Sequence, residues 1–227
     1  MGDALCVSMH PASVPALHSR NVLARLYLVR HGEVSNPDHV VYADLPGFRL
    51  TQTGRDEAAA AAFQLEAESV DVVVASPLER AVETARPIAA ALDAPLQVDD
   101  RLTEWRLLQR WAGIVWEDLG KAFPGETEAY LSHPDDLPFT PESIAEVAER
   151  IASLIDDLGA TCPGGAAVLV SHQDPVQAIR LHLTGRPLGE LPTDKPDHGT
   201  VLTLRADEPW TEIDRWDPPA PGRPAPA

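Results

Sequence analysis

The chain has 227 residues, of which 44% are hydrophobic and 23% are charged. This length suits one larger domain better than two, and the composition excludes a disordered chain. Acidic residues outnumber basic ones 35 to 18, and the resulting net charge of −17 disfavours nucleic acid and anionic membrane surfaces as partners.

The positions of the cysteines and of the apolar residues exclude further classes of protein. Cys6 and Cys162 are too far apart for a disulfide framework or a paired-cysteine metal site. No apolar run approaches the ~20 residues of a membrane-spanning helix, and the first 20 residues lack the basic start and apolar block of a secretory signal. We therefore expect a soluble cytoplasmic protein.

The two ends of the chain differ from its middle. Residues 1–23 show no clear period, and residues 217–227 are rich in proline and alanine. Both ends are expected to be mobile tails. Residues 24–216 are then expected to form a single domain.

Short β-rich runs alternate with helical patterns through that domain. Several of the β-rich runs are apolar without alternation, which is typical of strands covered on both faces. In chain order, the patterns predict a strand at 25–29, a helix at 50–68, strands at 70–76 and 95–98 around a helix at 77–92, a helix at 141–159, a strand at 166–171, a helix at 174–185 and a strand at 200–206.

Local signals predict where the helices begin and end. Thr51 or Thr53 is the expected N-cap of the first helix. Pro87 is expected to kink or restart the second helix. Gly159 and Gly185 are expected to end the third and fourth.

The alternation predicts an α/β fold, with an open and mostly parallel β-sheet covered by helices on both faces. Ligands of such sheets bind beyond the carboxyl ends of the strands. The segment 101–140 is rich in tryptophan, proline and acidic residues, and we expect it to be a lid-like insertion over that edge.

Two arginines and two histidines follow predicted strands and share that edge. Arg30 and His31 end the strand 25–29, Arg80 lies in the first turn of the helix after 70–76, and His172 ends the strand 166–171. Each alone is more often a structural residue. Together they suit a phosphoryl group, because arginine forks bind its oxygens bidentately and stay charged.

Other histidines lack this placement. His133, His182 and His198 do not follow a predicted strand. We therefore expect them to be ordinary structural or surface residues.

Five segments together resemble a known family. The segments "LYLVRHGE", "LPGFRLTQTGRDEA", "ASPLERAVETA", "RLTEW" and "VLVSHQDPV" are similar to the histidine phosphatase superfamily, the phosphoglycerate-mutase-like group. The resemblance covers about residues 25–205, most of the chain. It implies the three-layer α/β fold of that group.

The resemblance also implies roles for individual residues. His31 would be the nucleophile that takes the phosphoryl group, and Arg30, Arg80 and His172 would surround its oxygens. Glu104 of "RLTEW" would be the proton donor, with a pKa raised by burial and by the incoming phosphate. No metal and no cofactor is required.

Two positions depart from the usual pattern of the family. Asn36 lies five residues after His31, where many relatives have an asparagine six residues after. Gln173 stands where a glycine often follows the second histidine. We expect Asn36 to contact phosphate, and Gln173 to face it with its backbone N–H.

The expected activity is that of a metal-independent phosphomonoesterase, which hydrolyses a small phosphorylated metabolite through a phosphohistidine. A cofactor-dependent phosphoglycerate mutase shares the same residues, but it needs extra basic residues near the site, and acidic residues outnumber basic ones in 101–140. A catalytically silent module that binds a phosphorylated ligand is a third alternative.

Two further questions stay open at this point. Trp105, Trp111 and Trp116 of the expected lid could stack on a substrate, although loop aromatics are more often packing anchors. Members of the family are often dimers or monomers, so a homodimer is one expected state.

Overall fold

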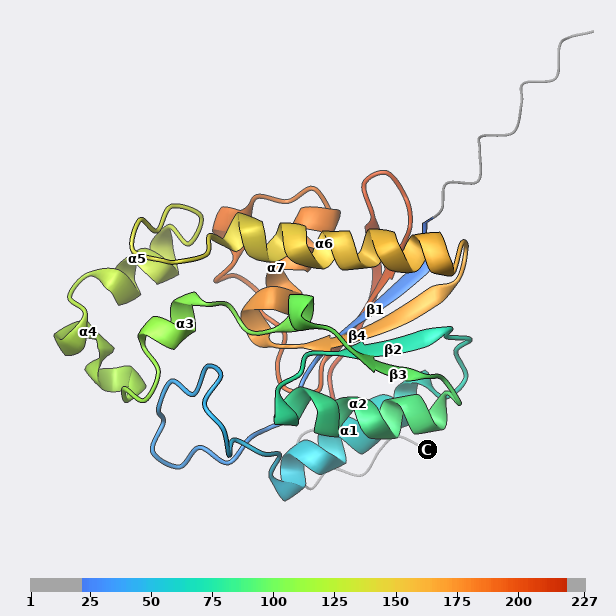
Figure 1. The fold of residues 1–227 in the computed structure, drawn as a ribbon, viewed down its shortest axis with the longest axis horizontal. Helices are drawn as coiled ribbons and strands as arrows, with labels where there is room; N and C mark the ends of the chain where they lie inside the picture. The colour runs from blue at the N-terminus through green and yellow to red at the C-terminus, as the bar shows by residue number, and fades with distance from the viewer. Residues whose placement is uncertain (1–21, 220–227) are drawn as a thin grey trace, which may run out of the picture.

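The computed structural model describes residues 22–219 and contains a six-stranded sheet with helices on both faces (Figure 1). The strand order is β3-β2-β4-β1-β5-β6. The strands are β1 (Arg25–Arg30), β2 (Val72–Ala75), β3 (Leu96–Val98), β4 (Ala166–Ser171), β5 (Val201–Arg205) and β6 (Thr211–Trp216). The strands β1 to β4 pair in parallel, whereas β5 and β6 are antiparallel additions. The expectation of an open, mostly parallel α/β sheet is confirmed.

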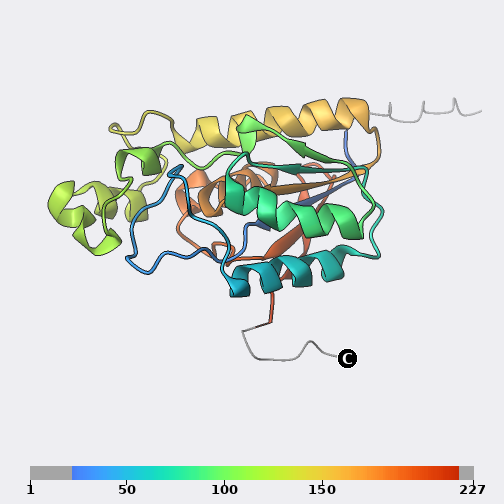
Figure 2. The same ribbon diagram turned by 60° about the horizontal axis from the view of Figure 1, so that its bottom comes forward.

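Four long helices form the outer two layers (Figures 1 and 2). One face carries α1 (Gln52–Leu65) and α2 (Glu79–Ala91), and the other carries α6 (Ile144–Thr161) and α7 (Gln173–Leu183). The segment between β3 and α6 forms shorter helices beyond the carboxyl ends of the parallel strands (Figure 1). They are η1 (Asp100–Leu102), α3 (Leu107–Arg110), η2 (Trp116–Asp118), α4 (Leu119–Ala122) and α5 (Glu126–Ser132), and η3 (Leu188–Glu190) follows α7.

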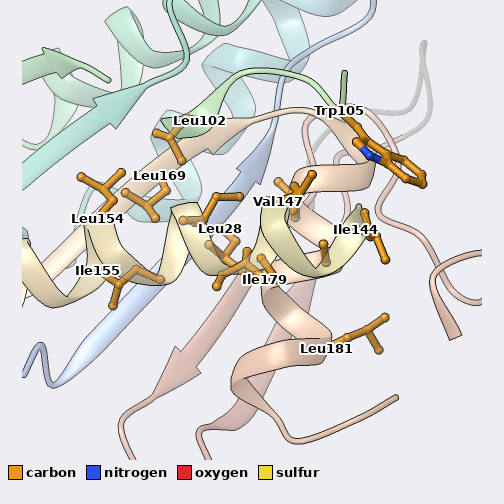
Figure 3. Close-up of a cluster of buried hydrophobic side chains, with 14 of the residues drawn as sticks. Leu28, Leu102, Trp105, Ile144, Val147, Leu154, Ile155, Leu169, Ile179 and Leu181 are labelled. Atoms are coloured by element: carbon orange, nitrogen blue, oxygen red, sulfur yellow. The ribbon is translucent and has the colours of Figure 1, made fainter. Parts of the chain in front are cut away.

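The central strand β1 supplies both cores because successive side chains of a strand point to opposite faces. Leu26 and Leu28 belong to the cluster under α6 and α7, and Tyr27 and Val29 to the cluster under α1 and α2. Figure 3 shows Leu28 among the aliphatic side chains of the first cluster. Burying a leucine or valine in this way stabilises the fold by about 1.5–3 kcal/mol. The strand that leads to His31 is therefore anchored on both faces.

The predicted helices are found, with differences at two of their signals. Thr51 is the N-cap of α1, where its hydroxyl accepts the Gly54 N–H (3.0 Å). α2 runs through Pro87 as one helix, so the predicted restart does not occur.

The prediction that the third helix ends at Gly159 is wrong. Gly159 is a buried position within α6, which continues to Thr161. The left-handed glycine that turns the chain toward β4 is Gly164, at φ 72°. A glycine on the packed face of a helix thus resembles a terminator in the sequence.

The strand β6 is missing from the predicted elements. Its residues are exposed or half-buried, and it pairs only with β5 at the edge of the sheet. An edge strand buries too little surface to require the apolar run by which the inner strands are recognised.

The predicted tails lie mainly outside the described residues. At their inner ends, Leu23 is fully buried in the core, and Asp217 accepts a hydrogen bond from the Thr200 hydroxyl (2.6 Å). The domain therefore extends past the predicted boundaries of 24 and 216. Among residues 22–219, no helix combines the length and the apolar character that a membrane crossing needs.

Candidate active site

His31 lies directly after β1, at the carboxyl edge of the parallel strands. Its backbone N–H donates to the Ser171 carbonyl at the end of β4 (3.0 Å). Its ring Nδ1 lies 2.8 Å from the Gly32 carbonyl oxygen. A carbonyl only accepts hydrogen bonds, so Nδ1 carries the proton and Nε2 keeps its lone pair.

The surroundings of His31 favour the neutral ring. Burial, followed by the charges of Arg80 and His172, lowers the pKa of His31 well below its ordinary value. The ring is only 1% exposed. At neutral pH the side chain is thus an uncharged imidazole, which is the form that acts as a nucleophile.

The loop that orients His31 is held by two glycines in close contact. A Cβ on Gly32 would lie 2.3 Å from the Gly54 carbonyl oxygen, and a Cβ on Gly54 would lie 2.1 Å from the Glu33 carbonyl oxygen. The Gly32 N–H also donates to the hydroxyl of Thr84 on α2 (3.0 Å). Both helices of this face therefore position the carbonyl that fixes the ring.

Arg80, in the first turn of α2, lies between the two predicted histidines. Its Nε lies 3.2 Å from His31 Nε2 and 3.2 Å from His172 Nδ1. Its Nη2 donates to the Ala43 carbonyl (2.7 Å), and its guanidinium lies 4.7 Å from the centre of the Tyr42 ring. These contacts fix the plane of the guanidinium beside the nucleophile.

His172 follows β4 and is fully buried. Its Nε2 lies 2.8 Å from the Ser76 hydroxyl at the end of β2, while Nδ1 accepts from Arg80. Burial and the charge of Arg80 lower its pKa well below the ordinary value. His172 is therefore a neutral group with its Nδ1 facing the same space as His31 Nε2.

Arg30 completes the group at the end of β1. Its Nη1 donates to the Pro196 carbonyl (2.9 Å), and its Nη2 lies 2.8 Å from His198 Nε2. Its Nε is buried and has no hydrogen-bond partner among the described residues. Buried donors are rarely left unsatisfied, so this N–H is available to an anion.

Glu104 lies just after the short helix η1, next to the same space. It is 9% exposed, and its Oε1 accepts the Trp105 N–H (2.9 Å). Burial, with the negative charge of Asp174 next, raises the pKa of Glu104 to about 7, against the opposing effect of Arg80. The carboxyl can therefore both give and take a proton near neutral pH.

Asn36 and Gln173 both line the cavity in front of His31. The Asn36 amide is occupied by the backbone of Val40, because Nδ2 donates to its carbonyl (2.9 Å) and Oδ1 accepts its N–H (3.1 Å). Gln173 is the first residue of α7, and its Nε2 donates to the Pro196 carbonyl (3.4 Å). Asn36 thus shapes the loop, while both residues border the cavity.

His198, which does not follow a predicted strand, lies in the site beside His31 and Arg30. Its ring centre lies 5.5 Å from that of His31, and its Nε2 contacts Arg30. Burial and the charge of Arg30 lower its pKa to about 3. His198 precedes β5, and because β5 runs antiparallel to β1, the start of β5 lies at the same edge as the end of β1. If the antiparallel direction of β5 were predicted from the sequence, His198 would be expected at this edge.

The cavity has a volume of about 290 Å³ and lies between two loops. The loop after His31 pairs with the lid segment through a bridge between Val40 and Val115. The cavity is lined by Arg30, His31, Asn36, His39, Val40, Val41, Tyr42, Ala43, Glu104, Leu108, Trp116, Tyr130, Gln173 and Asp174. Of the three lid tryptophans, Trp105 and Trp111 are fully buried, whereas Trp116 is 40% exposed.

A second polar cluster, which the sequence analysis does not identify, borders the cavity beside Glu104. The Lys195 ammonium donates to Asp174 Oδ1 (2.6 Å) and to the Tyr130 hydroxyl (2.5 Å). The Tyr130 hydroxyl in turn donates to Asp174 Oδ2 (3.0 Å). Within residues 22–219, no group of three or more His, Cys, Asp or Glu side chains is arranged to hold a metal ion.

Comparison with known proteins identifies similar chains. An uncharacterized protein of Mycobacterium tuberculosis is 37% identical over 170 residues, which cover 72% of this chain and 80% of the relative. A glucosyl-3-phosphoglycerate phosphatase of Mycolicibacterium vanbaalenii is 31% identical over 179 residues, covering 74% of this chain and 77% of the relative.

A solved structure and a family model agree with these relatives. The native structure of a mycobacterial glucosyl-3-phosphoglycerate phosphatase matches with a TM-score of 0.74 at 26% identity, over 84% of this chain and 97% of that chain. The model of the histidine phosphatase superfamily (branch 1) matches residues 26–218. The phosphatases among these relatives support a phosphatase activity for this chain. The protein belongs to the histidine phosphatase superfamily.

Proposed function

We propose that the protein is a phosphomonoesterase that hydrolyses a small phosphorylated metabolite through a phosphohistidine on His31, with Glu104 as proton donor and without a metal. The observation that carries the proposal is the neutral ring of His31, whose unprotonated Nε2 faces the Arg80 guanidinium in a buried site. A nucleophile beside a fixed arginine suits attack on phosphorus.

In the first half-reaction, His31 Nε2 attacks phosphorus and the bond from phosphorus to the ester oxygen breaks. Protonated Glu104 gives its proton to the departing oxygen, so that an alcohol leaves rather than an alkoxide. The pKa of about 7 keeps a large fraction of Glu104 protonated at neutral pH.

In the second half-reaction, water attacks the phosphorus of phosphohistidine and the bond from phosphorus to Nε2 breaks. The Glu104 carboxylate takes the proton from the attacking water, and inorganic phosphate leaves. Glu104 is protonated again at the end, so one carboxyl serves both steps.

The charged groups around His31 are suited to the transition state. The transferring group spreads its negative charge over equatorial oxygens, which are stabilised by donors that are already in place. Arg80 is fixed by Ala43 and Arg30 by Pro196, so neither guanidinium needs to reorganise. The unsatisfied Nε of Arg30 supplies a donor for one of these oxygens.

The pairing of the lid's basic side chains favours the phosphatase over a phosphoglycerate mutase. A mutase must hold a second acidic group of its substrate, which requires unpaired cations. Three of the four Arg and Lys side chains of 101–140 are paired with carboxylates: Arg101 with Asp99 (2.8 Å), Arg110 with Glu126 (2.8 Å) and Lys121 with Asp118 (2.6 Å).

Phosphate release from 4-nitrophenyl phosphate tests the proposal. The wild-type protein should release phosphate, and His31→Ala should lower the rate by at least about a thousandfold, because the covalent route is lost. His133→Ala is the matched control, since His133 lies exposed on the lid beside Ser132. It should keep wild-type activity.

Three outcomes would contradict the proposal. Trapping of labelled phosphate on another residue in acid-free quenched protein would remove His31 as nucleophile. Folded wild-type protein that binds phosphate esters but forms no phosphohistidine would favour the silent binding module. Efficient isomerisation of phosphoglycerate with little phosphate release would favour the mutase.

A further inference from the structure

Two carboxyl groups border the cavity. Asp174 lines the cavity and is 2% exposed, and Glu104 lines the same space. Among the described residues that line it, Arg30 is the only Arg or Lys, and that side chain belongs to the phosphate site. The alcohol part of a substrate therefore meets hydrogen-bond acceptors of carboxyl groups and not cationic side chains.

A further cation beside the cavity, Lys195, is already engaged by Asp174. Its ammonium lies 2.6 Å from Asp174 Oδ1 and 2.5 Å from the Tyr130 hydroxyl, and 4.7 Å from the centre of the Tyr130 ring. The Lys195 side chain is 14% exposed, so few of its contacts are with solvent. Lys195 is therefore paired with Asp174 and does not offer a free positive charge to a ligand.

The remaining basic groups near the cavity are also directed elsewhere. His39, at the exposed rim, lies 3.4 Å from Glu117 Oε1. Arg106 is exposed and lines a neighbouring cavity, which shares Ala43 and Glu104 with this one. Neither provides a buried cation for a second acidic group of a substrate.

Part of the remaining wall is apolar, and the cavity is small. Leu108 and Trp116 line the cavity from the lid, and Val40 lines it from the loop after His31. The Trp116 ring packs against Tyr130 with its centre 6.2 Å away, yet 40% of the residue stays exposed. A volume of about 290 Å³ lies at the lower end of ligand pockets, which suits a small metabolite.

We propose that this cavity selects phosphomonoesters of uncharged, hydroxyl-bearing alcohols, and that Asp174 is the residue that discriminates against a carboxylated alcohol. The inference rests on the proposed phosphatase function and deepens it by naming the substrate class. Asp174 Oδ2 accepts one hydrogen bond from Tyr130 and has a lone pair left for a substrate hydroxyl. A substrate carboxylate at the same place would meet a fixed carboxylate with no unpaired cation beside it.

An isosteric substrate pair tests the selectivity directly. Glycerol 3-phosphate and 3-phosphoglycerate differ only by a CH₂OH group in place of a carboxylate. We expect kcat/KM for glycerol 3-phosphate to exceed that for 3-phosphoglycerate by at least about tenfold, because like charges in a partly desolvated site repel. Equal values, or a preference for 3-phosphoglycerate, would overturn the inference.

Asp174→Asn tests which residue is responsible. The amide keeps the shape of Asp174 but leaves the Lys195 charge uncompensated, so the ratio of the two kcat/KM values should shift toward 3-phosphoglycerate by at least about tenfold. Adding Lys195→Met to Asp174→Asn should reverse most of that shift. Glu128→Gln, on the exposed surface of α5, removes one negative charge away from the cavity and should leave the ratio unchanged. An equal effect of Asp174→Asn on both substrates would assign Asp174 a merely structural role.

A binding measurement separates this inference from the proposed function. In His31→Ala, calorimetric dissociation constants for the same two esters do not depend on turnover. Tighter binding of glycerol 3-phosphate by at least about tenfold would support the selectivity even if wild-type protein released no phosphate from 4-nitrophenyl phosphate. Tighter binding of 3-phosphoglycerate would overturn it even if the phosphatase activity were established.

Discussion

The two sides of the cavity are built in different ways. The side that we propose to hold phosphate, called the phosphate side below, is formed at the ends of strands and in the first turn of a helix. It comprises Arg30 and His31 at the end of β1, Arg80 in α2 and His172 after β4. The opposite side consists of the loop after His31 and the short helices of the lid. The first side rests on both hydrophobic cores, whereas the lid is anchored in only one of them, through buried side chains such as Trp105, Trp111 and Tyr130.

This difference separates chemistry from selectivity. The groups proposed to act on phosphorus are buried except for Arg30, which is half-buried, and each side chain is fixed by contacts with residues of the sheet, the helices or the neighbouring loops. The second side presents the partly exposed Trp116 and the buried Tyr130 of the lid, and the Tyr130 hydroxyl contacts Asp174 in the first turn of α7. Changes on the first side should therefore affect the rate for every phosphate ester, and changes on the second should affect which ester is preferred.

Arg80→Lys should give the largest loss after removal of the nucleophile. Lysine lacks the forked guanidinium that contacts His31, His172 and the Ala43 carbonyl at once. We expect kcat to fall by about 10²–10³-fold for all esters, as when one preorganised donor is removed from a charged transition state. Arg49→Lys is the control, since Arg49 is an exposed partner of Glu79 at the start of α2. A loss confined to one substrate would contradict the division between the two sides.

Glu104→Gln should cost activity in proportion to the basicity of the leaving group. An alkyl phosphate needs a proton on the departing oxygen, so kcat/KM should fall by about 10²-fold, whereas 4-nitrophenyl phosphate should lose much less. The raised pKa of Glu104, about 7, means that the acid form prevails below pH 7 and is lost as pH rises.

The wild-type profile of kcat/KM for an alkyl phosphate should therefore fall above about pH 7. This falling limb should disappear in Glu104→Gln. A falling limb that persists in the variant would assign the titration to another group.

The phosphate side was largely predictable from the sequence, because it depends on short signals. Uninterrupted apolar runs mark β1 and β4, and parallel strands bring their carboxyl ends to one edge. His31 and His172 follow these runs directly, so their proximity follows from the topology. Glu104 could be placed only through the resemblance of "RLTEW", because no strand or helix signal points to it.

The rest of the site depends on contacts that no local pattern encodes. His198 was missed because the antiparallel direction of β5 was not predicted. In the sequence, Asp174 is 44 residues from Tyr130 and 21 residues from Lys195. Their meeting depends on how the lid packs against α7, which is set by tertiary packing rather than by periodicity.

Gly54→Ala tests how firmly the phosphate side is held. The new Cβ would lie 2.1 Å from the Glu33 carbonyl oxygen, so α1 or the His31 loop must move. We expect a loss of about 1–3 kcal/mol in the free energy of unfolding, with a lower kcat for all esters. Gly120→Ala in α4 is the control, because its Cβ would meet nothing within 4 Å. Equal denaturation midpoints for the two variants would contradict the proposed close contact.

Trp116→Ala should have the smallest effect, and it tests most directly whether the two sides of the cavity act independently. Trp116 lines the cavity while 40% of it stays exposed, so its removal leaves the core intact, and unfolding should change by less than about 1 kcal/mol. If the ring packs on the apolar face of a substrate, KM for a hexose phosphate should rise by about three- to tenfold, and KM for glycerol 3-phosphate should change little. A matching fall in kcat for both esters would mean that Trp116 positions the phosphate side, and the two sides would then not be independent.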